Sequence, residues 1–165
     1  MSNARITSEK ARTGKVIVGT IRPGTDIITG ILKICEENNL KFGNIVTMIG
    51  NLSKAHFVCV TPDDSNKMGF KVSEPIEIKG PLEFVCGQGI IGISDSKERE
   101  IHLHCVLCDK NAKLYGGHFN KGGNPVLTTM EVVIQELKEV KLIRALDQET
   151  GFPGFKPYGK VQSLK

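Results

Sequence analysis

The segment Ile101-His-Leu-His-Cys-Val-Leu-Cys-Asp-Lys-Asn-Ala-Lys-Leu-Tyr-Gly-Gly-His118 predicts a β-hairpin. Its polar run from Asp109 to Ala112 is typical of the tight turn that joins two antiparallel strands. From Phe42 onward, other short runs rich in β-branched residues are also separated by turn residues. We therefore expect a largely antiparallel sheet, with turns at Gly50-Asn51, Pro62-Asp63-Asp64, Gly80-Pro81, Asp95-Ser96 and Asp109-Lys-Asn111.

One helix is predicted near the N-terminus. The residues from Lys15 to Arg22 indicate a strand, which the turn Pro23-Gly24 ends. Thr25 or Asp26 can cap the helix that follows, and Asn38-Asn39 ends it. Its apolar residues recur at helical spacing and form a single stripe: Ile27, Ile28, Ile31, Leu32 and Cys35.

The last third of the chain contains one ambiguous segment and a tail. Met130, Val133, Ile134 and Leu137 fit helical spacing, but the Val, Thr and Ile content of residues 126–137 favours a strand. The tail from Gly151 onward is rich in Pro and Gly and predicts a loop. Three aromatic residues can pack this loop on the domain: Phe152, Phe155 and Tyr158.

The composition is that of a single globular domain. A chain of 165 residues suits one domain, and 39% hydrophobic with 24% charged residues excludes a disordered or collagen-like chain. The apolar runs are far shorter than the roughly 18 residues of a membrane helix, so we expect no membrane span. Five cysteines, an odd number, indicate free thiols in a reducing compartment, and we expect a cytoplasmic protein.

Three histidines carry the most specific chemistry. Residues two apart on a strand share a face, so His102 and His104 present their imidazoles about 7 Å apart, a spacing that can chelate a metal ion. A turn centred on Asn111 sets His118 opposite His104, and three imidazoles then converge. A shifted turn, or a bulge at Gly116-Gly117, would instead leave two histidines on a polar face and the third in an exposed turn. If the three converge, a zinc-like ion keeps a fourth position open for water or a ligand.

Two other motifs look like binding sites but lack the required context. Cys105 and Cys108 have the spacing of a zinc or redox pair, but no second pair and no following helix accompany them, so we interpret both as packing residues. The run Gly87-Gln-Gly-Ile-Ile-Gly92 matches the letters of a dinucleotide fingerprint. The residues after it have no apolar stripe for the helix that binds the pyrophosphate, so glycines of a bulged strand are the better interpretation.

The histidine motifs resemble the signature of the plant and prokaryote conserved (PPC) domain family. The shared pattern is His102-Leu-His104, then Asp109, then Gly116-Gly117-His118. Further agreement lies at Arg22-x-Gly24-x-Asp26, Gly50-Asn-Leu-Ser53, Gly80-Pro-Leu-Glu83, Thr129-Met-Glu-Val-Val133, Asp147 and Thr150-Gly151. The resemblance covers about residues 14–151, which leaves a polar N-terminal arm, residues 1–13, and a C-terminal tail, residues 152–165.

The resemblance implies an α+β fold, with a twisted, mainly antiparallel sheet and one principal helix packed on it, assembled as a homotrimer. It also implies that His102, His104 and His118 bind a divalent metal, usually taken as zinc. The plant relatives are DNA-associated through an AT-hook, Arg-Gly-Arg-Pro, which is missing here because Arg22-Pro23 follows Thr20-Ile21. With a net charge of +4 and no recognition helix rich in Arg, Asn and Gln, DNA is expected to be a weak partner.

Two classes of function follow. As a binding module, the protein would act through protein or weak DNA contacts, with the metal stabilising the fold or sensing a ligand. As a zinc-dependent enzyme, it would act on a small anionic or carbonyl substrate, with Glu83 as the base and Arg22, before the helix, as an anion clamp. An acidic residue lining the metal pocket would favour the enzyme, whereas a continuous basic face would favour DNA.

Overall fold

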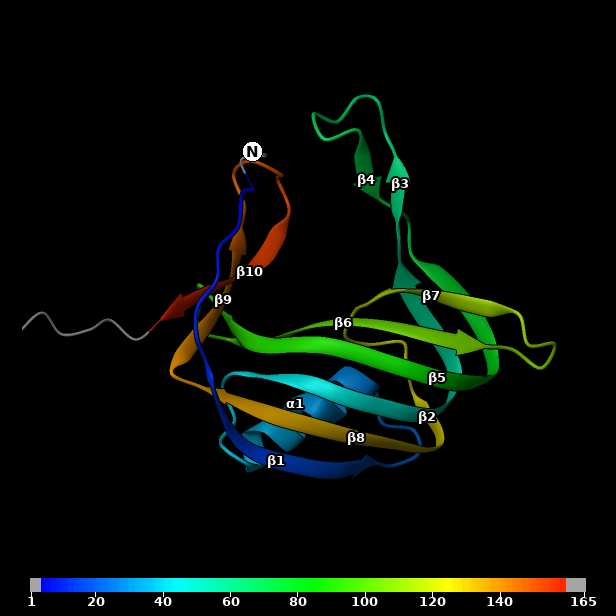
Figure 1. Ribbon diagram of the computed structural model, residues 1–165. Helices are drawn as coiled ribbons and strands as arrows, with labels where there is room; N and C mark the ends of the chain where they lie inside the picture. The colour runs from blue at the N-terminus through cyan, green and yellow to red at the C-terminus, as the bar shows by residue number, and fades with distance from the viewer. Residues whose placement is uncertain (1–3, 160–165) are drawn as a thin grey trace, which may run out of the picture.

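The computed structural model describes residues 4–159, which form ten strands and one helix (Figure 1). In chain order these are β1 (Arg12–Ile21), α1 (Ile27–Glu37), β2 (Gly43–Val58), β3 (Val60–Pro62), β4 (Phe70–Val72), β5 (Ile76–Ser94), β6 (Arg99–Cys108), β7 (Leu114–Phe119), β8 (Val126–Lys138), β9 (Val140–Leu146) and β10 (Pro153–Gly159). The expected α+β class, with a mainly antiparallel sheet and one principal helix, is confirmed. Within residues 4–159, no helix has the length and apolar composition needed to cross a bilayer.

Eight of the strands form one sheet in the order β1-β8-β2-β7-β6-β5-β9-β10. All neighbours pair antiparallel except β5 and β9, which are parallel. The long strand β2 also pairs with β5. The pairings β2–β5, β5–β6, β6–β7 and β7–β2 therefore form a closed ring of four strands. The strands β3 and β4 form a separate two-stranded sheet that rises from this body, as Figure 1 shows.

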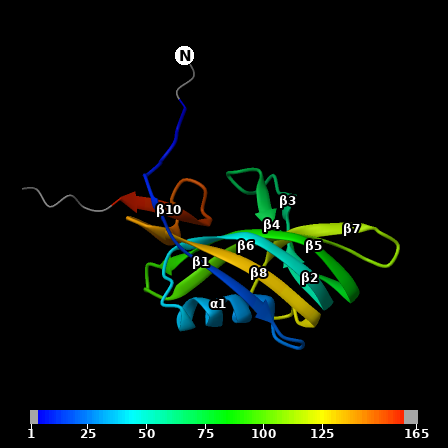
Figure 2. The same cartoon turned by 60° about the horizontal axis from the view of Figure 1, so that its bottom comes forward.

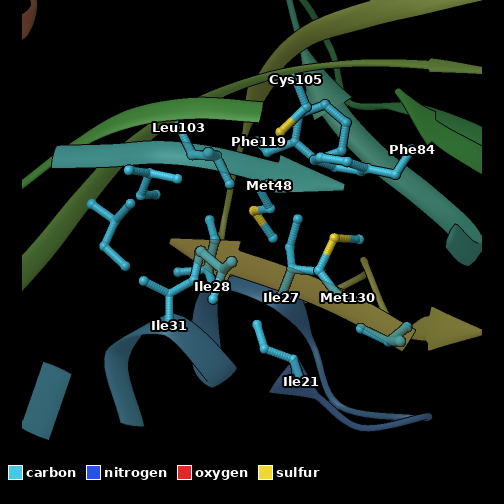
Figure 3. Close-up of a cluster of buried hydrophobic side chains, with 14 of the residues drawn as sticks. Ile21, Ile27, Ile28, Ile31, Met48, Phe84, Leu103, Cys105, Phe119 and Met130 are labelled. Atoms are coloured by element: carbon cyan, nitrogen blue, oxygen red, sulfur yellow. The ribbon is translucent and has the colours of Figure 1, made fainter. Parts of the chain in front are cut away.

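The helix α1 covers one side of the sheet (Figure 2). It begins where the sequence predicts, because the Asp26 carboxylate accepts a hydrogen bond from the backbone N–H of Thr29 at 3.0 Å and caps the first turn. Its apolar stripe belongs to one buried cluster with the inward residues of the strands, which include Leu103 and Cys105 of β6 (Figure 3). The even-numbered residues of β6 therefore point away from this core, toward the opposite face.

The ambiguous segment at residues 126–137 is a strand, as its β-branched content predicts. Two predicted turns are wrong, because Gly50-Asn51 lies inside β2 and Gly80-Pro81 lies inside β5. At both places a neighbouring backbone comes too close for any side chain. A Cβ on Gly50 would overlap the carbonyl oxygen of Thr129, and one on Gly80 would overlap that of Ser53.

The predicted C-terminal loop is also wrong over its described part. Residues 153–159 form β10, which pairs with β9 at seven positions. Pro153 and Pro157 are tolerated because β10 is the edge strand of the sheet. The tail does pack on the domain through its aromatic residues: Phe152 stacks on Phe70 of β4, with ring centroids 5.0 Å apart. The tail residues after 159, and residues 1–3 of the expected N-terminal arm, lie outside the described range.

Candidate metal centre

The three predicted histidines lie together on the outward face of β6 and β7. His104 is the direct antiparallel partner of His118, and His102 is two residues away on β6. One ring nitrogen of each histidine lies within 4.8 Å of the others, and the Nε2 atoms of His102 and His104 are 3.0 Å apart. The prediction that a turn centred on Asn111 brings the three imidazoles together is therefore confirmed.

The turn between β6 and β7 sets this register. The Asp109 carboxylate accepts hydrogen bonds from the backbone N–H groups of Asn111 and Lys113, at 2.8 and 3.1 Å. These bonds, that of Asn111 first, lower the pKa of Asp109 below its ordinary value. Pairing then runs without a bulge from Cys108–Leu114 to Leu103–Phe119.

The two glycines before His118 allow neighbouring strands to approach. A Cβ on Gly117 would lie 2.6 Å from the carbonyl oxygen of Val58, and one on Gly116 would lie 2.7 Å from that of Cys105. Only glycine fits between these backbones without a shift. In the Gly-Gly-His motif, the two glycines thus let the strands pack closely, and the histidine after them is a candidate metal ligand.

The local environment favours the neutral form of two of the imidazoles, those of His102 and His118. Partial burial, followed by repulsion from His102, His104 and Arg144, lowers the pKa of His118 to about 4. Burial also lowers the pKa of His102, with smaller contributions from His104 and Arg144. A neutral imidazole is the form that binds a metal ion, so no proton has to leave at neutral pH.

A hollow of about 520 Å³ opens beside two of the histidines. Its lining residues come from β2, β5 and β6 and carry no acidic side chain: Asn44, Ile45, Val46, Gln88, Gly89, Ile90, His102 and His104. Gln88 pairs directly with His104, and Ile90 lies between His102 and Asn44 across three neighbouring strands. The hollow therefore runs from the histidines over Ile90 to two amide side chains, those of Gln88 and Asn44.

The structure does not bring Glu83 to the histidines. Glu83 lies on β5 opposite Cys108, four residues along β6 from His104. This separation is about 13 Å at the rise of a strand. Glu83 is also absent from the lining of the hollow.

Arg22 is likewise remote from the three imidazoles. It is exposed in the turn before α1, where its carbonyl oxygen accepts the backbone N–H of Thr25. The helix covers the side of the sheet that carries Leu103, whereas His102 and His104 point to the other side. The position expected for an anion clamp is therefore not beside the histidines.

The two cysteines of the Cys-x-x-Cys pair do not join the histidines. Cys105 is 3% exposed and packs in the core, where burial raises the pKa of its thiol. Cys108 shares the outward face of β6 but lies near its end, opposite Leu114. These positions agree with the interpretation of both as packing residues.

Sequence reasoning missed one charged residue of this region, Arg144 of β9. Its Nη1 atom lies 3.1 Å from the Oε2 atom of Glu100, which precedes His102 by two residues on β6. The guanidinium also lies over the ring of Phe155, 5.9 Å from the ring centroid. No local motif marks Arg144, because it reaches the site through the parallel pairing of β9 with the end of β5.

The donor set fits a divalent ion of the zinc type. Imidazole nitrogens suit zinc, copper, iron and nickel better than magnesium or calcium, which prefer oxygen. Three protein ligands leave one tetrahedral position free, which distinguishes catalytic or ligand-binding sites from closed structural ones. His102, His104 and His118 would be the residues that hold the ion.

Several solved structures share this fold. A metal-containing protein of Archaeoglobus fulgidus superposes with a TM-score of 0.77 at 23% identity, over 91% of this chain and 99% of that one. A PPC protein of Pyrococcus horikoshii gives 0.74 at 22% identity, over 92% and 97%. A protein of Bacteroides thetaiotaomicron, named as a proposed DNA-binding protein, gives 0.72 at 17% identity, over 88% and 96%.

Two curated proteins also match, but only over a small part of their length. Both are called bifunctional protein GlmU, from Synechococcus strains JA-3-3Ab and JA-2-3B'a(2-13). Each is 25% identical, over 142 and 130 residues, which is 85% and 79% of this chain. The chain spans about a fifth of the length of these relatives, at 20% and 18%.

The family model of the Plants and Prokaryotes Conserved domain matches residues 8–138, which is most of the chain and includes all three histidines. The match begins a few residues before the expected boundary at residue 14 and ends in β8. With the shared fold, this match shows that the chain belongs to the Plants and Prokaryotes Conserved domain family.

Proposed function

We propose that the protein is a homotrimeric metal-binding module in which a zinc-like ion bound by His102, His104 and His118 keeps one position open for a ligand. The observation that carries this proposal is the convergence of three imidazoles, with their ring nitrogens within 4.8 Å of one another. The description of the Archaeoglobus fulgidus protein as metal-containing supports it. When bound, such an ion would supply a positive centre that attracts or polarises a ligand.

A binding or regulatory role is favoured over an enzymatic one. Hydrolysis assisted by a zinc ion needs a group that accepts or delivers a proton near the reacting atoms. The hollow beside the histidines carries amides and apolar side chains but no carboxylate, and Glu100, on the same face of β6, is paired with Arg144 at 3.1 Å. Glu83 lies too far along the strand pair to serve there. The site is therefore suited to holding a ligand rather than to transforming it.

DNA remains a second candidate partner. The fold relatives from Bacteroides thetaiotaomicron and Ralstonia eutropha are named as proposed DNA-binding proteins. This chain has a net charge of +4 and no AT-hook, which supports only weak, sequence-independent contact with phosphates.

The five cysteines are free thiols in the structure, which is compatible with a cytoplasmic location.

Elemental analysis of protein purified without chelator tests the metal site. Wild type should contain close to one zinc-like ion per chain, and His104→Ala should lose most of it, because one ligand in three is removed. His56→Ala is the matched control, since His56 lies on β2 outside the cluster and should leave the metal content unchanged. Equal metal content in wild type and a folded His104→Ala variant would refute the site.

A further inference from the structure

We infer that Arg144 is the anion-binding residue of the three-histidine site, and that the ligand of this site carries a small oxyanion, either a carboxylate or a phosphate. The inference rests on the proposed function, because it assigns the ligand class of the same site. It assigns to Arg144 the anion-binding role that was expected for Arg22. Arg144 lies on β9, beyond residue 138, where the family match ends.

Arg144 of β9 contacts Glu100, the residue two before His102 on β6. Glu100 and His102 are two residues apart on that strand and point to the same face, so their positions differ by about 7 Å. The guanidinium contacts Glu100 at 3.1 Å. With a metal ion bound by the three histidines, this face would carry two positive centres, the ion and the guanidinium of Arg144, and Glu100 offsets part of the second.

The hairpin formed by β9 and β10, the C-terminal hairpin, holds the guanidinium of Arg144 in place. Gly92 of β5 faces Phe155 of β10, where a Cβ would lie 2.5 Å from the ring and would overlap the carbonyl oxygen of Leu142. This glycine lets the hairpin pack directly on the sheet, and the Phe155 ring then supports Arg144. The Arg144 side chain is only 16% exposed. A side chain held in this way loses little entropy when it binds an anion.

The guanidinium has hydrogen-bonding capacity left over. An arginine offers five N–H donors, yet among residues 4–159 the side chain of Arg144 makes one hydrogen bond, from Nη1 to Glu100. Its Nε is buried without a partner. Buried donors are nearly always hydrogen-bonded in native proteins, so a guanidinium with an unpartnered donor is suited to receive an oxygen acceptor. An oxyanion has at least two oxygens and can offer one to the metal site and another to the guanidinium.

Calorimetric titration of the zinc-loaded full chain tests the inference, with sodium phosphate and sodium succinate as separate probes. At least one probe should bind at one site per chain, and the probe that binds identifies which oxyanion the site prefers. Arg144→Gln should weaken that binding at least about tenfold, the effect expected for loss of a charge-assisted hydrogen bond, with metal content unchanged. Arg12→Gln is the matched control, because Arg12 is exposed and pairs with Glu139 far from the histidines in sequence.

Glu100→Gln gives a test that loss of folding cannot imitate. Removing the carboxylate that competes for the guanidinium should tighten binding of the same probe, whereas a destabilised variant would bind more weakly. Unchanged or weaker binding by Glu100→Gln, equal binding by Arg144→Gln and wild type, or no binding of either probe would overturn the inference. If wild type contains no metal, the proposed function fails separately. The same titrations on the metal-free chain then decide the role of Arg144.

Discussion

His104 of β6 stands directly opposite His118 of β7 in the antiparallel ladder. Opposed residues in such a pair have Cβ atoms about 4.5–5.5 Å apart, which is within the reach of one metal ion. A slip of one residue would turn His118 to the other face of the sheet. The Asp109 turn and the close approach at Gly116 and Gly117 are therefore as necessary to the site as the imidazoles.

The first prediction concerns the thiols. Cys105→Ser and Cys108→Ser should leave metal content unchanged, because Cys105 points into the core and Cys108 lies about 13 Å along β6 from His104. Cys105→Ser should lower the free energy of unfolding by about 1–3 kcal/mol, since it buries a hydroxyl. Elemental analysis and thermal unfolding of each variant measure the two effects. Metal loss in a folded variant would place a thiol among the ligands.

The second prediction concerns Asp147, in the turn between β9 and β10. A hydrogen bond from Lys156, followed by those from the backbone N–H groups of Thr150 and Glu149, lowers the pKa of Asp147 to about 2. A depressed pKa means that the carboxylate stabilises the hairpin above its ordinary pKa of 3.8, and that this contribution disappears as the pH falls through about 2.

Carbon-detected NMR titration of Asp147 measures this shift directly. In Lys156→Ala the pKa of Asp147 should rise toward 3.8, because the largest cause of the shift is removed. Lys141→Ala serves as the control, since Lys141 pairs with Tyr158 on the same hairpin and should leave the titration unchanged. An Asp147 that titrates near 3.8 in wild type would contradict the hydrogen bonds of this turn.

The sequence predicts those parts of the fold that depend on neighbours in the chain. The cap at Asp26, the stripe on α1 and the turn at Asp109 are all local signals, and each is confirmed. The histidine cluster could be predicted because a single hairpin contains all three residues. Its register follows from one turn, whereas the approach of Gly117 to Val58 depends on a distant strand.

The parts that could not be predicted depend on contacts between distant segments. Gly50 and Gly80 look like turn residues, but they serve as points of close approach inside two long strands, and only the paired backbone shows this. The tail looks like a loop because of its prolines, which an edge strand tolerates. Arg144 reaches the site only because β9 pairs with β5, about 50 residues away in the chain.

The third prediction concerns DNA. Binding to duplex DNA should be weak, similar for random and AT-rich sequences, and mostly lost near physiological salt, because a chain with a net charge of +4 and no AT-hook offers only phosphate contacts. Gel-shift titrations of both duplexes at two salt concentrations measure this. Nanomolar, sequence-selective binding at physiological salt would instead make DNA recognition the main function.

The last prediction is that the protein is an obligate trimer. The outward face of β1, β8 and β2, which α1 does not cover, carries exposed apolar side chains among polar ones. Val16, Val18 and Ile49 are 56%, 77% and 47% exposed, and Val18 pairs with Val133. Apolar surface of this kind is stabilised when another copy covers it. Light scattering should report about three times the chain mass of 18.0 kDa. Val133→Glu should dissociate or unfold the assembly, because it places a charge on this outward face where the copies meet. Ile134→Glu should unfold the chain, because Ile134 is fully buried in the core. A well-folded wild-type monomer at micromolar concentration would refute the trimer and leave this apolar face without a function.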